Sequence, residues 1–73
     1  MNIKEARLLF QAGALKEPVI RKTQGGWIAV LEGKHPLNPA LETARGPIRV
    51  FKTADAAIET LFEVGFHHIG IAR

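Results

Sequence analysis

The stretch of residues 47–66 constrains the fold of this chain more than any other part of its sequence. It begins with Ile-Arg-Val-Phe, whose β-branched and aromatic side chains suit a half-buried strand. Thr53 then stands where a helix N-cap is expected, and Asp55 follows in the first turn, where a carboxylate favours the positive end of the helix dipole. Apolar residues recur at helical spacing up to Val64, and Gly65 is the residue type that best ends a helix. The sequence therefore predicts a strand followed by an amphipathic helix.

A second helix is predicted near the N-terminus. Asn2 and Glu5 have the spacing of a capping box, in which each side chain accepts a hydrogen bond from the other residue's backbone amide. Apolar residues then recur along one stripe until Gly13. We expect a helix over residues 3–12 that ends at this glycine.

Two strands are predicted after this helix, over residues 19–23 and 27–31. They flank the glycines at 25–26, a pair that favours a two-residue hairpin loop because both positions tolerate positive φ. If these glycines form the loop, Ile20 pairs with Leu31. The second strand is apolar on both faces, because side chains alternate along a strand and nearly every residue of it is apolar. Such a strand is usually covered on each side.

After a proline-rich loop, short strands are predicted over residues 40–43 and 48–52. A turn at residues 45–46 would place Glu42 opposite Arg49 as a pair of opposite charge. This pairing would extend the sheet by two antiparallel strands.

A final strand is predicted over residues 67–72, parallel to the strand at 48–52, because the loops around the intervening helix are short. These elements define an α+β fold, in the order α-β-β-β-β-α-β, in one small domain of residues 1–73. It is expected to hold one small antiparallel sheet, an N-terminal helix and a second helix that leads to the final strand.

Size and composition limit what this fold can do. A chain of 73 residues has a thin core, worth roughly 3–5 kcal/mol, and the absence of cysteine excludes disulfides. Self-association is the expected additional support, so we expect a homodimer. The net charge of +3 suits an acidic partner such as DNA. No apolar run reaches membrane-spanning length and no secretory signal is evident, so a cytoplasmic protein without membrane contact is expected.

Catalytic groups are scarce. The chain contains no Ser, Cys or Tyr, so threonines are its only hydroxyl nucleophiles. Glu59 and Glu63 lie one helical turn apart and could mimic an acid/base pair, although a solvated helix face explains them as well. We expect no enzymatic activity and no cofactor.

The histidines raise the question of a metal site. His67 and His68 are neighbours on a predicted strand, so their side chains point to opposite faces and do not easily share one ion. His35 lies in the proline-rich loop and could join one of them, but three ligands with metal geometry are not evident. We expect no metal, and interpret these histidines as surface or partly buried polar residues.

Basic residues form the remaining collective signal. Five of them lie on predicted strands or at a turn tip: Arg21, Lys22, Arg45, Arg49 and Lys52. They could form a stripe across one sheet that contacts nucleic acid, and scattered solubility charges are the alternative interpretation. Trp27 could stack on a base or anchor an interface, or it could pack in the core.

One sequence pattern combines a Trp that opens a strand with a phrase of the F-x-T-x-x-x-A kind that leads into a helix. The residues that carry it are Trp27, Ala29, Phe51, Thr53 and Ala57. In this half of the chain the sequence resembles the plant AP2-type and phage-integrase N-terminal DNA-binding domains. That resemblance implies a three-stranded sheet placed in the major groove.

A second pattern extends over nearly the whole chain: Trp27, Leu41, Arg45, Gly46, Arg49, Phe51, Thr53, Ala56, Ala57, Leu61, Gly65 and Phe66. It is similar to small proteins encoded near plasmid partition and maintenance genes, and it implies an accessory role without catalytic residues. The expected function is a non-enzymatic bacterial or plasmid accessory protein that binds nucleic acid through a basic sheet face, with another plasmid-maintenance protein as a further partner. The alternative is a protein–protein interaction module, dimerising or docking a partner, with no nucleic-acid role.

Overall fold

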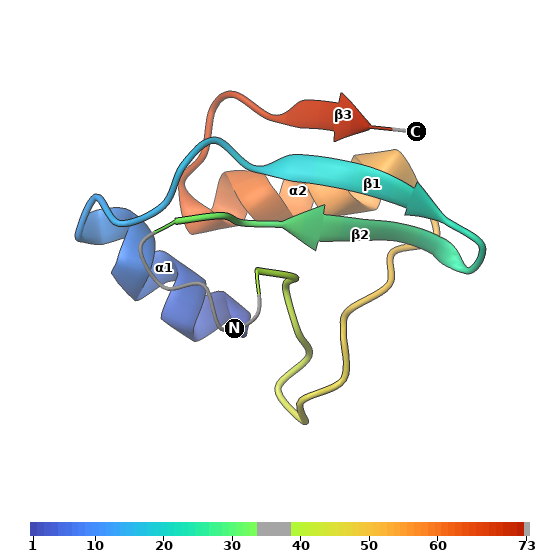
Figure 1. The fold of residues 1–73 in the computed structure, drawn as a ribbon, viewed down its shortest axis with the longest axis horizontal. Helices are drawn as coiled ribbons and strands as arrows, with labels where there is room; N and C mark the ends of the chain where they lie inside the picture. Colours follow the sequence, from blue (N-terminus) through green and yellow to red (C-terminus); the bar gives the residue numbers. More distant parts are fainter. Residues whose placement is uncertain (34–38, 73) are drawn as a thin grey trace.

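Two helices and a three-stranded sheet make up the fold in a computed structural model, which describes residues 1–33 and 39–72. The elements are α1 (Ile3–Gln11), β1 (Val19–Thr23), β2 (Gly26–Val30), α2 (Ala54–Val64) and β3 (Gly70–Ala72) (Figure 1). The predicted α+β class is confirmed. The sheet order is β2-β1-β3, and β1 runs antiparallel to β2 but parallel to β3, so the sheet is mixed.

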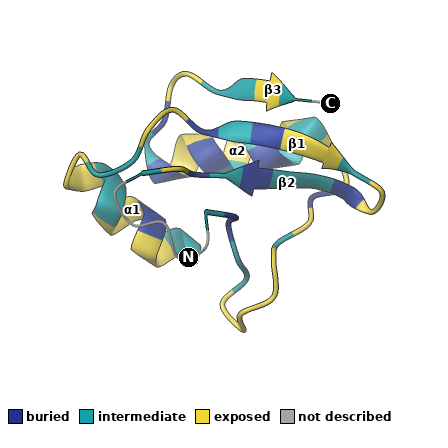
Figure 2. Cartoon of the chain, viewed as in Figure 1, coloured by how far each residue is buried: buried dark blue, intermediate teal, exposed yellow. Residues whose placement is uncertain are grey.

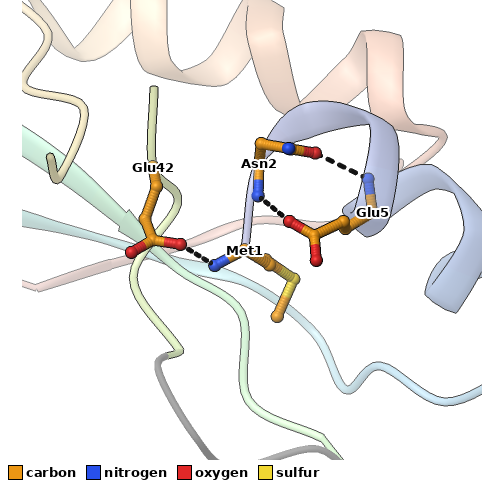
Figure 3. A network of polar contacts seen from close by, with 4 residues as sticks. All are labelled: Met1, Asn2, Glu5 and Glu42. Carbon is orange, nitrogen blue, oxygen red and sulfur yellow. Dashed lines mark hydrogen bonds and ion pairs between the residues drawn. The ribbon is translucent and has the colours of Figure 1, made fainter. Parts of the chain in front are cut away.

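Helix α1 begins at the predicted capping box. The Glu5 amide donates to Asn2 Oδ1 at 2.9 Å, and the Asn2 amide donates to Glu5 Oε1 at 3.0 Å (Figure 3). The helix ends just before Gly13, whose φ of 71° lets the Ala14 amide reach back to the Leu9 carbonyl at 2.9 Å. Local sequence signals therefore set both ends of α1.

The start of α1 is tied to the segment that follows β2. The Met1 α-amine donates to Glu42 Oε1 at 2.5 Å, and the Glu42 amide donates to the Met1 carbonyl at 2.7 Å (Figure 3). The Met1 and Glu42 side chains are only 7% and 24% exposed, so solvent screens this ion pair less than it screens a surface pair. The pair fixes the helix to a residue 41 positions away.

Helix α2 follows the predicted cap, stripe and stop. The Ala56 amide donates to Thr53 Oγ1 at 3.1 Å, as expected of an N-cap threonine. At the other end Gly65 has φ 131°, and the Phe66 amide donates to the Leu61 carbonyl at 3.2 Å. This last bond satisfies a carbonyl that would otherwise lack a partner in the helix.

The core lies between α2 and one face of the sheet. Ile20 of β1 pairs with Ala29 of β2, and both side chains are fully buried. The core cluster consists of Ala6, Ile20, Ala29, Leu31, Leu41, Phe51, Ala57, Leu61, Val64 and Phe66. In Figure 1 α2 crosses behind β1 and β2, so the other face of the sheet points toward the viewer.

The β1–β2 hairpin has a different loop from the one predicted. Residues 24–25 form it, and Gly26 pairs with Thr23 inside the sheet. Gly26 is buried, and a Cβ at this position would overlap the carbonyl oxygen of Phe51, so the glycine serves a close backbone approach. Every predicted pair shifts by two residues, and an even shift keeps each side chain on its predicted face.

The segments predicted as third and fourth strands (40–43 and 48–52) are extended but form no continuous ladder. Isolated bridges join them to β2 and to each other: Val30 with Ala40, Trp27 with Phe51, and Glu42 with Ile48. Pro39 and Pro47, which precede the two segments, have no amide hydrogen to donate to a ladder.

Glu42 and Arg49 do not face each other, so that prediction is wrong. Because Glu42 bridges Ile48, Leu41 lies opposite Arg49, whose amide donates to the Leu41 carbonyl at 2.9 Å. The observed register therefore differs from the predicted one by one residue, and a shift of one residue places the two charged side chains on opposite faces. Glu42 binds the Met1 amine instead.

The final strand is shorter than predicted and has another partner. It covers Gly70–Ala72 and pairs in parallel with β1, not with residues 48–52. The outer edge of β2 already holds the bridged segments, and the Gly70 amide donates to the Pro18 carbonyl at 2.8 Å beside β1.

We expect Gly65→Ala to destabilise the protein by about 2–3 kcal/mol. A Cβ at this position would lie 2.5 Å from Cε2 of Phe10, and φ is 131°. Gly13→Ala is the control, because φ there is 71° with no heavy atom within 4 Å of the added Cβ. It should cost about 1 kcal/mol. Urea denaturation followed by circular dichroism measures both; equal losses would show that the ring of Phe10 yields freely.

Glu42→Gln should lower the free energy of unfolding by about 1–2 kcal/mol, because it removes the charge that binds the partly buried Met1 amine. Glu59→Gln, on the exposed side of α2, should change it by less than about 0.5 kcal/mol. The two variants are compared by urea denaturation at neutral pH. No difference between them would mean that the ion pair adds nothing to stability.

Candidate nucleic-acid interface

Two aromatic rings each lie beside a cation at the hairpin end of the sheet. Lys22 Nζ is 5.5 Å from the centre of the Trp27 ring, and the guanidinium carbon of Arg49 is 6.0 Å from that of Phe51. Backbone bonds of 2.7 Å, one in each direction, join Trp27 to Phe51. We name Lys22, Trp27, Arg49, Phe51 and the adjoining Lys52 the cation–aromatic cluster.

Strand register explains why four of these side chains share a face. Lys22 pairs with Trp27 across the hairpin, and Phe51 bridges Trp27 on the other side. Arg49 precedes Phe51 by two residues in an extended segment, so it points the same way. The chain then passes through Lys52 into α2, whose first turn carries the opposing charge of Asp55.

The five basic residues predicted to bind nucleic acid do not form one stripe. Lys22, Arg49 and Lys52 belong to the cluster. Arg21 is exposed on the opposite face of β1, and Arg45 is exposed in the turn between the two bridged segments. Figure 2 shows this turn as exposed. The structure therefore brings Lys22 and Arg49 to neighbouring rings, with Lys52 next to Phe51 in the chain, and separates the other two.

Arg49 is held in an unusual environment. Its side chain is half-buried, and Nε is buried without a hydrogen-bond partner among the described residues. Placing a charged donor there costs free energy that no internal acceptor offsets, although contact with Phe51 recovers part of it. Lys22 and Lys52 are exposed, so their ammonium groups remain available to an acidic partner.

Trp27 lies partly in the core. It is half-buried and packs against the core, while Lys22 lies over its ring. Phe51 belongs to the cation–aromatic cluster but not to the predicted binding set. The predicted resemblance to the AP2-type domains rests on both Trp27 and Phe51, and it is the signal that could have grouped them, because nothing local in the sequence joins these two positions.

The histidines do not form a metal site among the described residues. His67 and His68 are exposed and line a shallow groove of about 330 Å³ with Phe10 and Phe66. Within the described part of the chain, no group of three or more His, Cys, Asp or Glu residues could hold a metal ion. His35 lies outside the described residues.

The candidate acid/base pair on α2 also lacks a site. Glu59 and Glu63 are both exposed on this helix. Neither of them lines the groove beside His67 and His68 or the groove beside Lys16 and Glu32. The solvated-face interpretation of these carboxylates is the simpler account of this geometry.

No family model, curated protein or solved structure matches this chain. In the residues that the structure describes, no helix has the length and hydropathy needed to cross a membrane. The function therefore has to be inferred from the geometry.

We expect Arg49→Met to leave the free energy of unfolding unchanged or to raise it by up to about 1 kcal/mol, because it keeps an unbranched apolar chain over Phe51 and removes a buried donor without a partner. Arg49→Ala also removes the packing and should lower it by about 1 kcal/mol. Thermal and urea unfolding measure both. A clear loss of stability in Arg49→Met would show that the charge itself stabilises the fold.

Proposed function

We propose that this chain is a non-enzymatic binding protein that contacts nucleic acid through the cation–aromatic cluster. The observation that supports this function is the pairing of two cations with two neighbouring aromatic rings at one end of the molecule, next to the exposed Lys52. Cations neutralise phosphates, and an aromatic side chain can stack on an unpaired base. Of the two rings, the half-buried Trp27 is the candidate for stacking, because Phe51 is only 7% exposed. The acidic residues Glu59 and Glu63 lie further along α2, which leaves the hairpin end the more basic.

A contact of this size is weak. Three cations neutralise about three phosphates, so affinity should fall on the order of 40-fold between about 50 and 200 mM salt. The overall charge of +3 adds little attraction. Useful affinity would need a second set of contacts, which fits the accessory role implied by the resemblance to plasmid-maintenance proteins. We propose that setting, in the bacterial cytoplasm, with another protein of the same system as a partner.

Removing cluster cations should weaken nucleic-acid binding. We expect Lys22→Gln/Lys52→Gln to reduce affinity for a labelled duplex about tenfold at low salt and to lower the salt slope by about 2. Fluorescence anisotropy measures the affinity, with a single-stranded oligonucleotide of the same sequence as a second probe. Emission from Trp27, the single Trp of the chain, should change on binding.

The matched control is Lys4→Gln/Lys16→Gln, which removes the same charge from two exposed lysines outside the cluster. It should change affinity less than about threefold, because only the long-range attraction is reduced. Absence of binding at low salt, or equal losses in the two double variants, would overturn the nucleic-acid proposal.

A second candidate function is favoured by the face of the sheet that α2 does not cover. Val19 pairs with Val30, and both point away from the buried Ile20 and Ala29. Ile28 lies on the same side by alternation. The result is an apolar sheet face that α2 does not cover and that points toward the viewer in Figure 1.

Two further side chains extend this face beyond β2. A Cβ added at Gly26 would lie 3.1 Å from Cγ1 of Val50, so Val50 sits over that glycine. Val50 and Ile48, two residues apart, are 50% and 46% exposed. We name Val19, Ile28, Val30, Ile48 and Val50 the open face. A protein–protein interaction module is the second candidate function, and the homo-oligomer expected from the sequence belongs to it.

A further inference from the structure

We propose that two copies of this chain pack open face to open face, with their strands antiparallel across the interface. The inference rests on the interaction-module proposal and gives it a partner. It uses other side chains than the nucleic-acid contact, because Lys22, Trp27, Arg49 and Phe51 lie on the other face of the sheet.

The shape of the open face suits a second sheet. The molecule measures 32 × 26 × 19 Å, and Figure 1 looks down its shortest axis onto this face, with α2 behind β1 and β2. A helix or a single peptide strand would contact only part of the face, whereas a second sheet can contact both strands at once.

The side chains of the open face suit sheet-on-sheet packing. All five are Val or Ile, whose branched, stiff side chains interdigitate well between sheets about 10 Å apart. Exposed apolar area of this kind is costly on an isolated small domain with a thin core. A second copy supplies the same β-branched surface, so the contact is complementary to itself.

Two charged residues set the relative direction of the copies. Arg21 pairs with Ile28 at the middle of the two strands and points to the open face. Glu32 follows the fully buried Leu31 in an extended segment, so it points to the same side at the far end of β2. Glu32 lies four residues beyond Ile28, which is about 13 Å along a strand. The face thus carries a cation at the middle of the strands and an anion beyond the end of β2.

A two-fold axis that crosses the strands reverses their direction between the copies. Arg21 of one copy then approaches Glu32 of the second copy, and the reverse contact forms by symmetry. An axis along the strands would instead bring Arg21 onto its own counterpart, which is repulsive. Charge complementarity therefore selects the antiparallel arrangement.

The first experiment is sedimentation equilibrium of the full chain at micromolar concentrations. The expected mass is twice the 8.0 kDa of one chain. Ile28→Lys, on the open face, should sediment as a monomer with an unchanged circular dichroism spectrum. Leu8→Lys is the matched control: Leu8 is 61% exposed on α1, away from this face, and its variant should remain dimeric.

The second experiment tests direction by exchanging charges. Arg21→Glu and Glu32→Arg should each weaken the dimer about tenfold or more, and the double variant should recover most of the lost affinity. If each single variant weakens the dimer and the double variant does not recover the lost affinity, the antiparallel arrangement is wrong.

Other outcomes separate this inference from the proposals it builds on. A dimer that survives Ile28→Lys overturns the open-face interface and leaves the interaction-module proposal standing. A wild-type chain that stays monomeric at all these concentrations overturns both the dimer and its interface. A monomer that still binds the labelled duplex would assign the function to the cation–aromatic cluster alone.

Discussion

Two backbone hydrogen bonds between Trp27 and Phe51 fix where α2 begins relative to the sheet. They form because Gly26 has no side chain, so the chain at residue 51 passes directly over the start of β2. From that anchor α2 crosses one sheet face and buries Ile20 and Ala29 beneath it. The same bonds bring Lys22 and Arg49 to neighbouring rings. Core and candidate site therefore depend on one close approach of two backbones.

Among the residues that the structure describes, only one face of the sheet is packed against a helix. A single helix covers the face with Ile20, while the face with Ile28 and Val30 has no element of comparable size over it in the described part of the chain. Larger α+β domains add a layer at this point. A chain of 73 residues has little sequence left for one. The two proposed contacts therefore involve different surfaces. Nucleic acid would bind at the hairpin end, and a second copy would bind on the open face.

Local signals in the sequence predicted both helices, because caps and stops act between residues a few positions apart. The capping box at Asn2 and the helix stop at Gly65 were foreseeable for this reason. Pairings between distant segments were not. The hairpin loop and the partner of β3 depend on contacts with residue 51 and on which sheet edge remains available. Alternation did predict the shared face of Trp27 and Ala29, but no spacing rule brings Phe51 beside Trp27.

The parallel pairing of Val19 with Gly70 has a consequence for the order of folding. The β1–β2 hairpin and α2 form through short loops, so their formation costs little conformational entropy and is fast. Strand β3 instead pairs with a strand about fifty residues earlier in the chain. The hairpin and α2 are thus assembled first, and the last strand docks onto an existing edge. While the chain is still being synthesised, β1 has one neighbour and one vacant side. The sheet reaches its final width only when its C-terminal residues have left the ribosome.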